Sequence, residues 1–93
     1  MNLDELRLEI DRIDRELVDL FSRRMAVSAE IAAYKKEHLL PVLDAERERS
    51  KRSSLAALAE PEMAEYVDAL YTRLFELSRS YQETLLSSDS DAV

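Results

Sequence analysis

The feature that most constrains this chain is an apolar seam in its first third. Apolar residues recur there at alternating intervals of three and four positions, a spacing that places them on one face of an α-helix. The seam residues are Leu3, Leu6, Ile10, Ile13, Leu17, Leu20, Val27, Ile31 and Tyr34. The pattern predicts one long helix from about Leu3 to Glu37.

A helix of this length is too long for one small chain to cover. It would extend about 50 Å, whereas a compact chain of 93 residues has a radius of gyration of about 12 Å. Part of the seam would therefore stay exposed to water unless another subunit covered it. We expect a homodimer.

Pro41 separates the long helix from a short second helix. Proline lacks a backbone donor and disfavours helical geometry in the residue before it. Asp44 is suited to cap a helix that runs from about Ala45 to Ala59. Leu55 and Leu58 are its clearest candidates for core residues.

Pro61 marks a second break and is acceptable in the first turn of a third, medium-long helix from about Glu62 to Leu86. The expected buried stripe of this helix contains Val67, Leu70, Tyr71, Leu74, Phe75, Ser78, Tyr81, Gln82 and Leu85. The chain has no glycine and only two prolines, which favours long helices over hairpins. We expect one all-α domain over residues 1–86 and a disordered acidic tail over residues 87–93.

Composition limits the cellular setting and the partners. Without cysteine there is no disulfide, zinc-thiolate site or cysteine nucleophile, and the acidic amino terminus does not resemble a signal peptide. No apolar run approaches the ~18 residues needed to cross a bilayer. A net charge of −7 disfavours nucleic acid. We expect a cytoplasmic protein in which any anionic ligand binds in a local basic pocket.

Arg24 interrupts the apolar seam of the long helix. A guanidinium at such a position is unfavourable without an anionic partner. Lys35, eleven residues later, returns to within about 20° of the same face. The two cations can therefore flank a small anionic ligand, although long basic side chains can also extend from a coiled-coil seam into water.

Two further groups of polar residues share helix faces. In the third helix the row from Phe75 turns polar at Ser78 and Gln82, as expected for a pocket or for a solvated helix end. In the second helix the triplet Asp44, Arg47 and Glu48 shares one face, as expected for a site or for a surface ladder of ion pairs.

Arg7 lies about 26 Å before Arg24 along the helix and about 100° around it. It cannot reach the site flanked by Arg24 and Lys35 in its own chain. If two long helices pack antiparallel about a two-fold axis, Arg7 can complete the site of the partner.

Taken in order, these residues resemble the all-helical chorismate mutase family over nearly the whole chain. The matching segments are Leu6-Arg7, Ile10-Asp11-Arg12-Ile13-Asp14, Leu20 through Arg24 to Lys35, Pro41-Val42-Leu43-Asp44-Ala45-Glu46-Arg47-Glu48, and Leu74-Phe75 with Ser78 and Gln82. The resemblance implies an intertwined, domain-swapped homodimer with two equivalent sites. It also implies an enzyme of aromatic amino acid biosynthesis, in the shikimate pathway, that needs no cofactor or metal.

The resemblance assigns a role to each candidate residue. Arg24 and the partner's Arg7 would bind the two substrate carboxylates, a task that suits the guanidinium fork. Lys35 and Gln82 would contact the ether oxygen. Glu48 and Asp44 would contact the ring hydroxyl, and Ser78 would contact a carboxylate. Arg47 would shape the loop and add positive potential.

These roles match the chemistry of converting chorismate to prephenate. This rearrangement breaks a carbon–oxygen bond as a carbon–carbon bond forms within one molecule, so no nucleophile is required. The enzyme holds the substrate in its reactive shape and stabilises the negative charge that grows on the ether oxygen. An isochorismate pyruvate-lyase on the same scaffold and a non-catalytic dimerisation or regulatory module are the alternatives.

Overall fold

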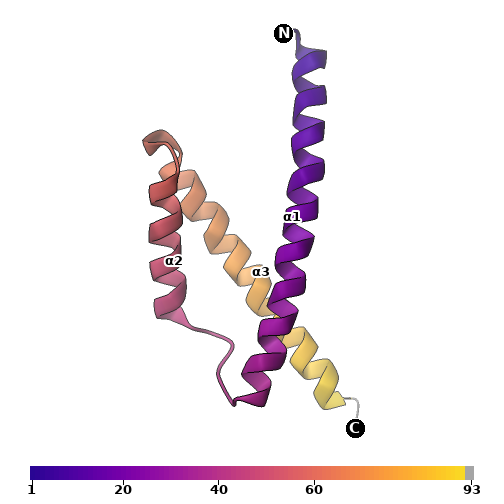
Figure 1. The fold of residues 1–93 in the computed structure, drawn as a ribbon, viewed down its shortest axis with the longest axis vertical. Helices are drawn as coiled ribbons and strands as arrows, with labels where there is room; N and C mark the ends of the chain where they lie inside the picture. The colour runs from indigo at the N-terminus through magenta and orange to yellow at the C-terminus, as the bar shows by residue number, and fades with distance from the viewer. Residues whose placement is uncertain (92–93) are drawn as a thin grey trace.

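The computed structural model describes residues 1–91, with side-chain surroundings through residue 87, and this part of the chain consists of helices joined by short connections. The elements are α1 (Leu3–Glu37), α2 (Ala45–Leu58), a 3₁₀ turn η1 (Pro61–Met63) and α3 (Ala64–Asp91) (Figure 1). No strand occurs among the described residues. The all-α prediction is confirmed, and both ends predicted for the long helix agree with α1.

Side-chain caps define where α1 and α2 begin. The side-chain oxygen of Asn2 accepts a hydrogen bond of 2.9 Å from the backbone N–H of Glu5. Asp44 does the same for the backbone N–H of Arg47 at 3.0 Å, as predicted. Each cap satisfies a backbone donor that has no partner within the helix.

The end of α1 is built without glycine. Leu39 adopts a left-handed conformation with φ of 55°. The backbone N–H of Leu40 then donates to the carbonyl of Lys35 at 2.8 Å, and that of Leu39 donates to the carbonyl of Lys36 at 3.3 Å. This is the Schellman pattern, which usually places glycine where Leu39 stands.

The third helix differs from its predicted bounds at both ends. Pro61 starts the 3₁₀ turn, and the α-helix begins at Ala64. At the other end α3 continues to Asp91, past the predicted end at Leu86. Residues 87–91 contain neither glycine nor proline, so no strong terminator follows Leu86. Residues 92–93 of the expected tail lie outside the described residues, and the division of the chain at residue 86 stays a prediction.

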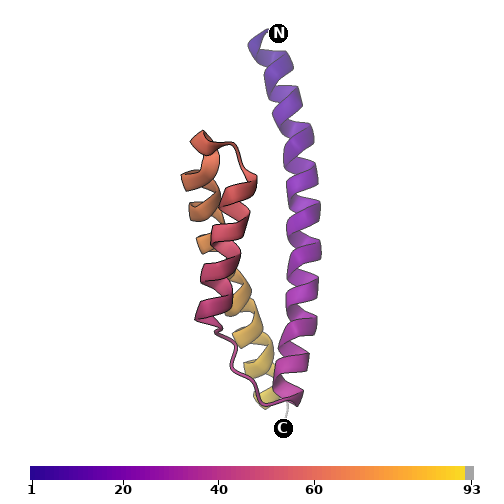
Figure 2. The same ribbon diagram turned by 60° about the vertical axis from the view of Figure 1, so that its left-hand side comes forward.

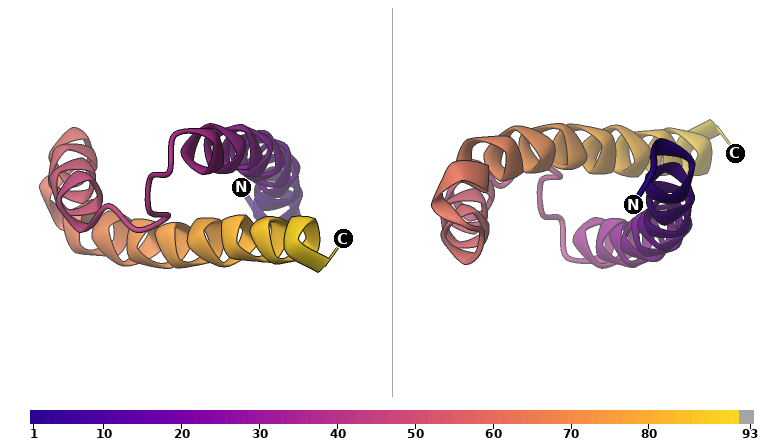
Figure 3. Two further views of the ribbon diagram at one scale, coloured as in Figure 1. Left: turned by 90° about the horizontal axis from the view of Figure 1, so that it is seen from below. Right: turned by 90° about the horizontal axis from the view of Figure 1, so that it is seen from above.

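The two later helices form an antiparallel pair, and α1 crosses the far half of α3 (Figures 1 and 2). Arg52 of α2 links this pair, since its guanidinium lies 3.5 Å from Asp68 and 3.4 Å from the hydroxyl of Thr72. Viewed end-on, α1 and α2 stand on the same side of α3 (Figure 3). Three helices thus surround a shared space.

The amino-terminal half of α1 stands away from the other two helices, and its first turns extend beyond their ends (Figure 2). The radius of gyration is 16.8 Å and the longest dimension is 57 Å, compared with about 12 Å for the radius of gyration of a compact chain of this size. The structure is therefore elongated, as the length of the first helix predicts.

The single chain has little apolar core. Among the described residues, Ala32 and Phe75 are the buried apolar side chains, and each of the nine seam residues is 43–59% exposed. In the predicted stripe of α3, Phe75, Ser78 and Gln82 are buried, but Leu70 and Tyr81 are exposed. The prediction that Leu58 is a core residue is wrong for the single chain, because it ends α2 and is 83% exposed.

No helix in the described part of the chain is both long and apolar enough to cross a bilayer.

Candidate active site

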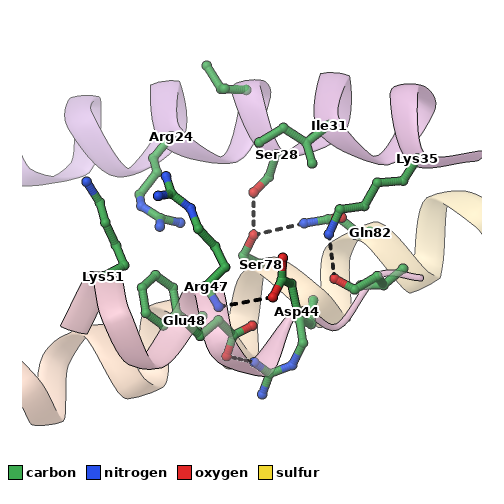
Figure 4. A pocket seen from close by; sticks show the side chains of 14 residues that line it. Arg24, Ser28, Ile31, Lys35, Asp44, Arg47, Glu48, Lys51, Ser78 and Gln82 are labelled. Carbon is green, nitrogen blue, oxygen red and sulfur yellow. Dashed lines mark hydrogen bonds and ion pairs between the residues drawn. The ribbon is translucent and has the colours of Figure 1, made fainter. Parts of the chain in front are cut away.

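A cavity of about 410 Å³ lies between the three helices. Cavities of this size hold small molecules. Its lining comes from the second half of α1, the loop before α2, the first half of α2 and the middle of α3 (Figure 4). The lining residues are Arg24, Val27, Ser28, Ile31, Lys35, Val42, Asp44, Arg47, Glu48, Lys51, Phe75, Ser78, Arg79 and Gln82.

The structure brings most of the predicted site residues to this one cavity. Those that line it are Arg24, Lys35, Asp44, Arg47, Glu48, Ser78 and Gln82. Arg7 does not join them, because it lies exposed on the projecting half of α1, about 26 Å from Arg24 along the helix. Arg7 is therefore not among the residues that line the cavity of its own chain.

The cavity is positively charged although the chain as a whole is negative. Five cationic side chains line it, against two carboxylates, in a chain of net charge −7. The cations are Arg24, Lys35, Arg47, Lys51 and Arg79. This local excess of positive charge attracts an anion and repels cationic ligands.

Arg24 is held by aromatic rings. Its guanidinium carbon lies 5.4 Å from the ring centre of Phe75 and 6.0 Å from that of Tyr71, within the range of cation–π attraction. No ion pair joins it to a carboxylate within residues 1–87. Figure 4 shows Arg24 extending from α1 toward α2, while Arg47 extends from α2 toward α1. The aromatic rings orient the Arg24 guanidinium, and its N–H donors remain available for a ligand.

Lys35 lies at the other end of the cavity. Its ammonium donates a hydrogen bond of 2.7 Å to the backbone carbonyl of Val42 and is half-buried. This bond ties the last turn of α1 to the loop before α2. An ammonium has three donors, so two remain for a ligand.

Three buried polar side chains form a hydrogen-bonded row where α1 crosses α3. The hydroxyls of Ser28 and Ser78 are hydrogen-bonded, and the side-chain amide nitrogen of Gln82 donates to Ser78 at 3.2 Å. The amide oxygen of Gln82 is buried and has no partner among the described residues. If the amide is turned over, its oxygen accepts from Ser78 and its nitrogen becomes the free end. In both orientations one polar end of Gln82 is left for a ligand.

The two carboxylates of the cavity have different surroundings. One oxygen of Asp44 caps α2. Glu48 forms an ion pair with Arg79, and both side chains are largely buried. No group of three or more His, Asp or Glu side chains within residues 1–87 is placed to hold a metal ion.

Lys51 and Arg79 were not predicted as site residues. Lys51 is four residues after Arg47 and three after Glu48, so extending the face of that triplet by one turn would have found it. Arg79 is four residues after Phe75 and three before Gln82. Its position adjoins the polar row of the third helix, but its partner on α2 is visible only in the fold.

Comparisons with known proteins agree with this geometry. Residues 6–83 match the model of the type II chorismate mutase family. The T-protein of Haemophilus influenzae is 44% identical over 46 residues, a segment that is 50% of this chain and 12% of that protein. No solved structure matched the chain. Because the family match spans most of the sequence, this chain belongs to the type II chorismate mutase family.

Proposed function

We propose that this protein is a chorismate mutase that rearranges chorismate to prephenate. The observation that supports this most directly is the cluster of five cationic side chains around one small cavity in an otherwise acidic chain. Chorismate carries two carboxylates, so it is an anion of the size and charge that this cavity favours. Family membership supports the same reaction.

Two arginines would bind the substrate carboxylates. Arg24 has its guanidinium oriented between α1 and α2 and has no carboxylate partner among the side chains of residues 1–87. Arg7 of the partner subunit would supply the second guanidinium. Two such contacts would hold the flexible enolpyruvyl group over the ring, which lowers the entropic part of the barrier.

Lys35 and Gln82 would stabilise the ether oxygen as its bond lengthens. Both line the cavity, and each has hydrogen-bonding capacity that the side chains described through residue 87 leave unused. The role of Gln82 requires the amide orientation in which its nitrogen is free, with Ser78 donating to its oxygen. Donors fixed around a developing charge need no reorganisation during the reaction.

The other polar residues would bind the rest of the substrate. Glu48 and Asp44 would accept from the ring hydroxyl, and Ser78 would contact a carboxylate. Arg47, which is exposed to solvent, would shape the loop and add positive potential. All four line the cavity.

The active form would be an intertwined homodimer. The exposed seam of α1 supports this, since all nine of its apolar residues remain more than 40% exposed in the single chain. Antiparallel packing of two projecting α1 halves would cover the seam and bring Arg7 toward the partner's cavity. We place the enzyme in the cytoplasm, a compartment that its lack of cysteine suits.

The test is turnover of chorismate by the purified protein, with prephenate measured as the product. Isochorismate is assayed in parallel, with salicylate as the product of a lyase. We expect prephenate from chorismate, and loss of turnover by about 10²–10³ in Lys35→Ala, because one fixed donor to the ether oxygen is removed. Binding of chorismate without turnover, or salicylate as the main product, would contradict the proposal.

A further inference from the structure

The ion pair between Arg79 and Glu48 joins two helices at the cavity. Arg79 belongs to α3 and Glu48 to α2, and their side chains are only 27% and 21% exposed. Two ion pairs that form within single helices, Arg12–Glu9 and Arg73–Glu76, are by contrast well exposed. Removal from water makes the Arg79–Glu48 interaction stronger than an ordinary surface pair.

A carboxylate in this cavity creates an electrostatic problem. Chorismate brings two negative charges, and an uncompensated Glu48 would repel them at short range in a partly buried site. Yet a hydrogen-bond acceptor is needed where the ring hydroxyl binds. A cation beside Glu48 resolves this conflict, because it cancels the charge and leaves the carboxylate able to accept a hydrogen bond.

The geometry of the pair suits this arrangement. The guanidinium of Arg79 donates through one nitrogen to one oxygen of Glu48. Figure 4 shows the second oxygen of Glu48 directed away from that contact. One oxygen thus binds the cation, while the other is available for a ligand hydroxyl.

We propose that Arg79 is a positioning residue, which neutralises Glu48 and orients its second oxygen toward the hydroxyl of the bound substrate. This role rests on the proposed mutase function. Arg79 acts through Glu48 and does not itself bind a substrate carboxylate. Its removal should therefore matter only while Glu48 carries a negative charge.

The experiment is a double-mutant cycle on steady-state kinetics with chorismate. It compares the wild type, Arg79→Leu, Glu48→Gln and the double variant. Chorismate has the same net charge in its ground and transition states, so the repulsion should weaken binding of both equally. We expect Arg79→Leu to raise KM about tenfold with little change in kcat, whereas the same substitution in the Glu48→Gln background should change KM less than about twofold.

Further variants separate this role from a structural one. Arg79→Lys keeps the cation, so its KM should stay close to that of the wild type. Arg79→Gln serves as the neutral variant if the leucine variant does not fold, and it should raise KM in the same direction. Arg73→Leu is the matched control, since it removes an exposed ion pair on the same helix and should leave KM unchanged.

The outcomes distinguish this role from the proposed function. An inactive wild type would overturn both. If the wild type is active, the role of Arg79 is overturned by an unchanged KM in Arg79→Leu. It is also overturned by an equal loss in the Glu48→Gln background, which would mean that Arg79 binds the substrate directly.

Discussion

Arg24 occupies a seam position where an apolar residue would fit the heptad, and the structure shows how it is accommodated. Its guanidinium lies against the rings of Phe75 and Tyr71 and faces the cavity. The neighbouring Arg23 is exposed. Two adjacent residues of one type therefore have different surroundings, because successive positions on a helix point about 100° apart.

This difference predicts unequal effects of the same substitution. Arg24→Lys keeps the charge but loses the planar fork that binds a carboxylate through two hydrogen bonds. We expect kcat/KM for chorismate to fall about ten- to a hundredfold, in line with the ~1.5–3 kcal/mol of a hydrogen bond to a charged group. Arg23→Lys, measured beside it, should stay within about twofold of the wild type. Equal losses in both variants would contradict the assignment of Arg24, and not Arg23, as the residue that binds the substrate carboxylate.

Gln82 allows a prediction about pH. A neutral amide donates at every pH, whereas a glutamic acid at this position donates only when protonated, and its carboxylate would repel the developing negative charge. The protonated form is the active one, so activity should be present below its pKa and lost as the pH rises through it. The reference pKa of glutamic acid is about 4.3, and burial raises it.

We therefore expect kcat of Gln82→Glu to be at least about tenfold higher at pH 5 than at pH 8, in line with the loss of one donor to the reacting oxygen. The wild type, assayed over the same range, should change far less. A Gln82→Glu profile parallel to that of the wild type would argue against a hydrogen bond from Gln82 to the ether oxygen.

At the scale of the elements, the junction after α1 positions Lys35 and contains a strained residue. The last turn of α1 and the loop that follows share the hydrogen bond from Lys35 to Val42. The turn itself depends on Leu39, which has a φ of 55° and is 91% exposed. A residue with a Cβ atom is strained in this conformation by about 1–2 kcal/mol.

Glycine at position 39 should relieve this strain. Part of the gain is lost to the greater entropy of glycine in the unfolded chain, so we expect Leu39→Gly to increase the free energy of unfolding by about 0.5–1 kcal/mol. Leu40→Gly, at a position without positive φ, should decrease it. Urea unfolding at one fixed protein concentration measures both, and a destabilised Leu39→Gly would show that the turn does not store strain.

At the scale of the whole molecule, the main feature is that the fold of one chain is incomplete. The described chain buries only two apolar side chains, while the seam of α1 is exposed and half of the helix projects from the others. A chain with so little buried apolar surface gains little stability from its own packing. The proposed dimer would supply both the missing core and Arg7.

Subunit complementation tests the donation of Arg7. Arg7→Ala and Lys35→Ala chains are each expected to be nearly inactive alone. Refolded together in equal amounts from urea, half of the dimers are mixed, and each mixed dimer has one site with Lys35 from one chain and Arg7 from the other. We expect about a quarter of the wild-type activity.

Each variant refolded alone is the control for this experiment. If Arg7 acts within its own chain, every site in the mixture lacks one of the two residues, and no activity returns. A sizing measurement on the wild type should show a dimer under the same conditions.

Much of the architecture could be predicted because its determinants are local. The three-four spacing of apolar residues predicted both ends of α1, and the side chain of Asp44 predicted the start of α2. The end of α3 was placed too early, because a run of serine and aspartate weakens a helix without terminating it. Periodicity and capping act over a few residues, which is why they can be read along the chain.

The sequence alone determined that Arg24 and Lys35 share one face of a long helix and that Arg7 lies too far away to join them. Only the tertiary structure decided which groups surround these cations. The crossing of α2 and α3 brings Arg79 to Glu48 across 31 positions of sequence, and the crossing of α1 and α3 joins Ser28 to Ser78 across 50. Such contacts depend on the angles at which helices pack, which are set by side chains along the whole interface and not by the spacing within any one helix.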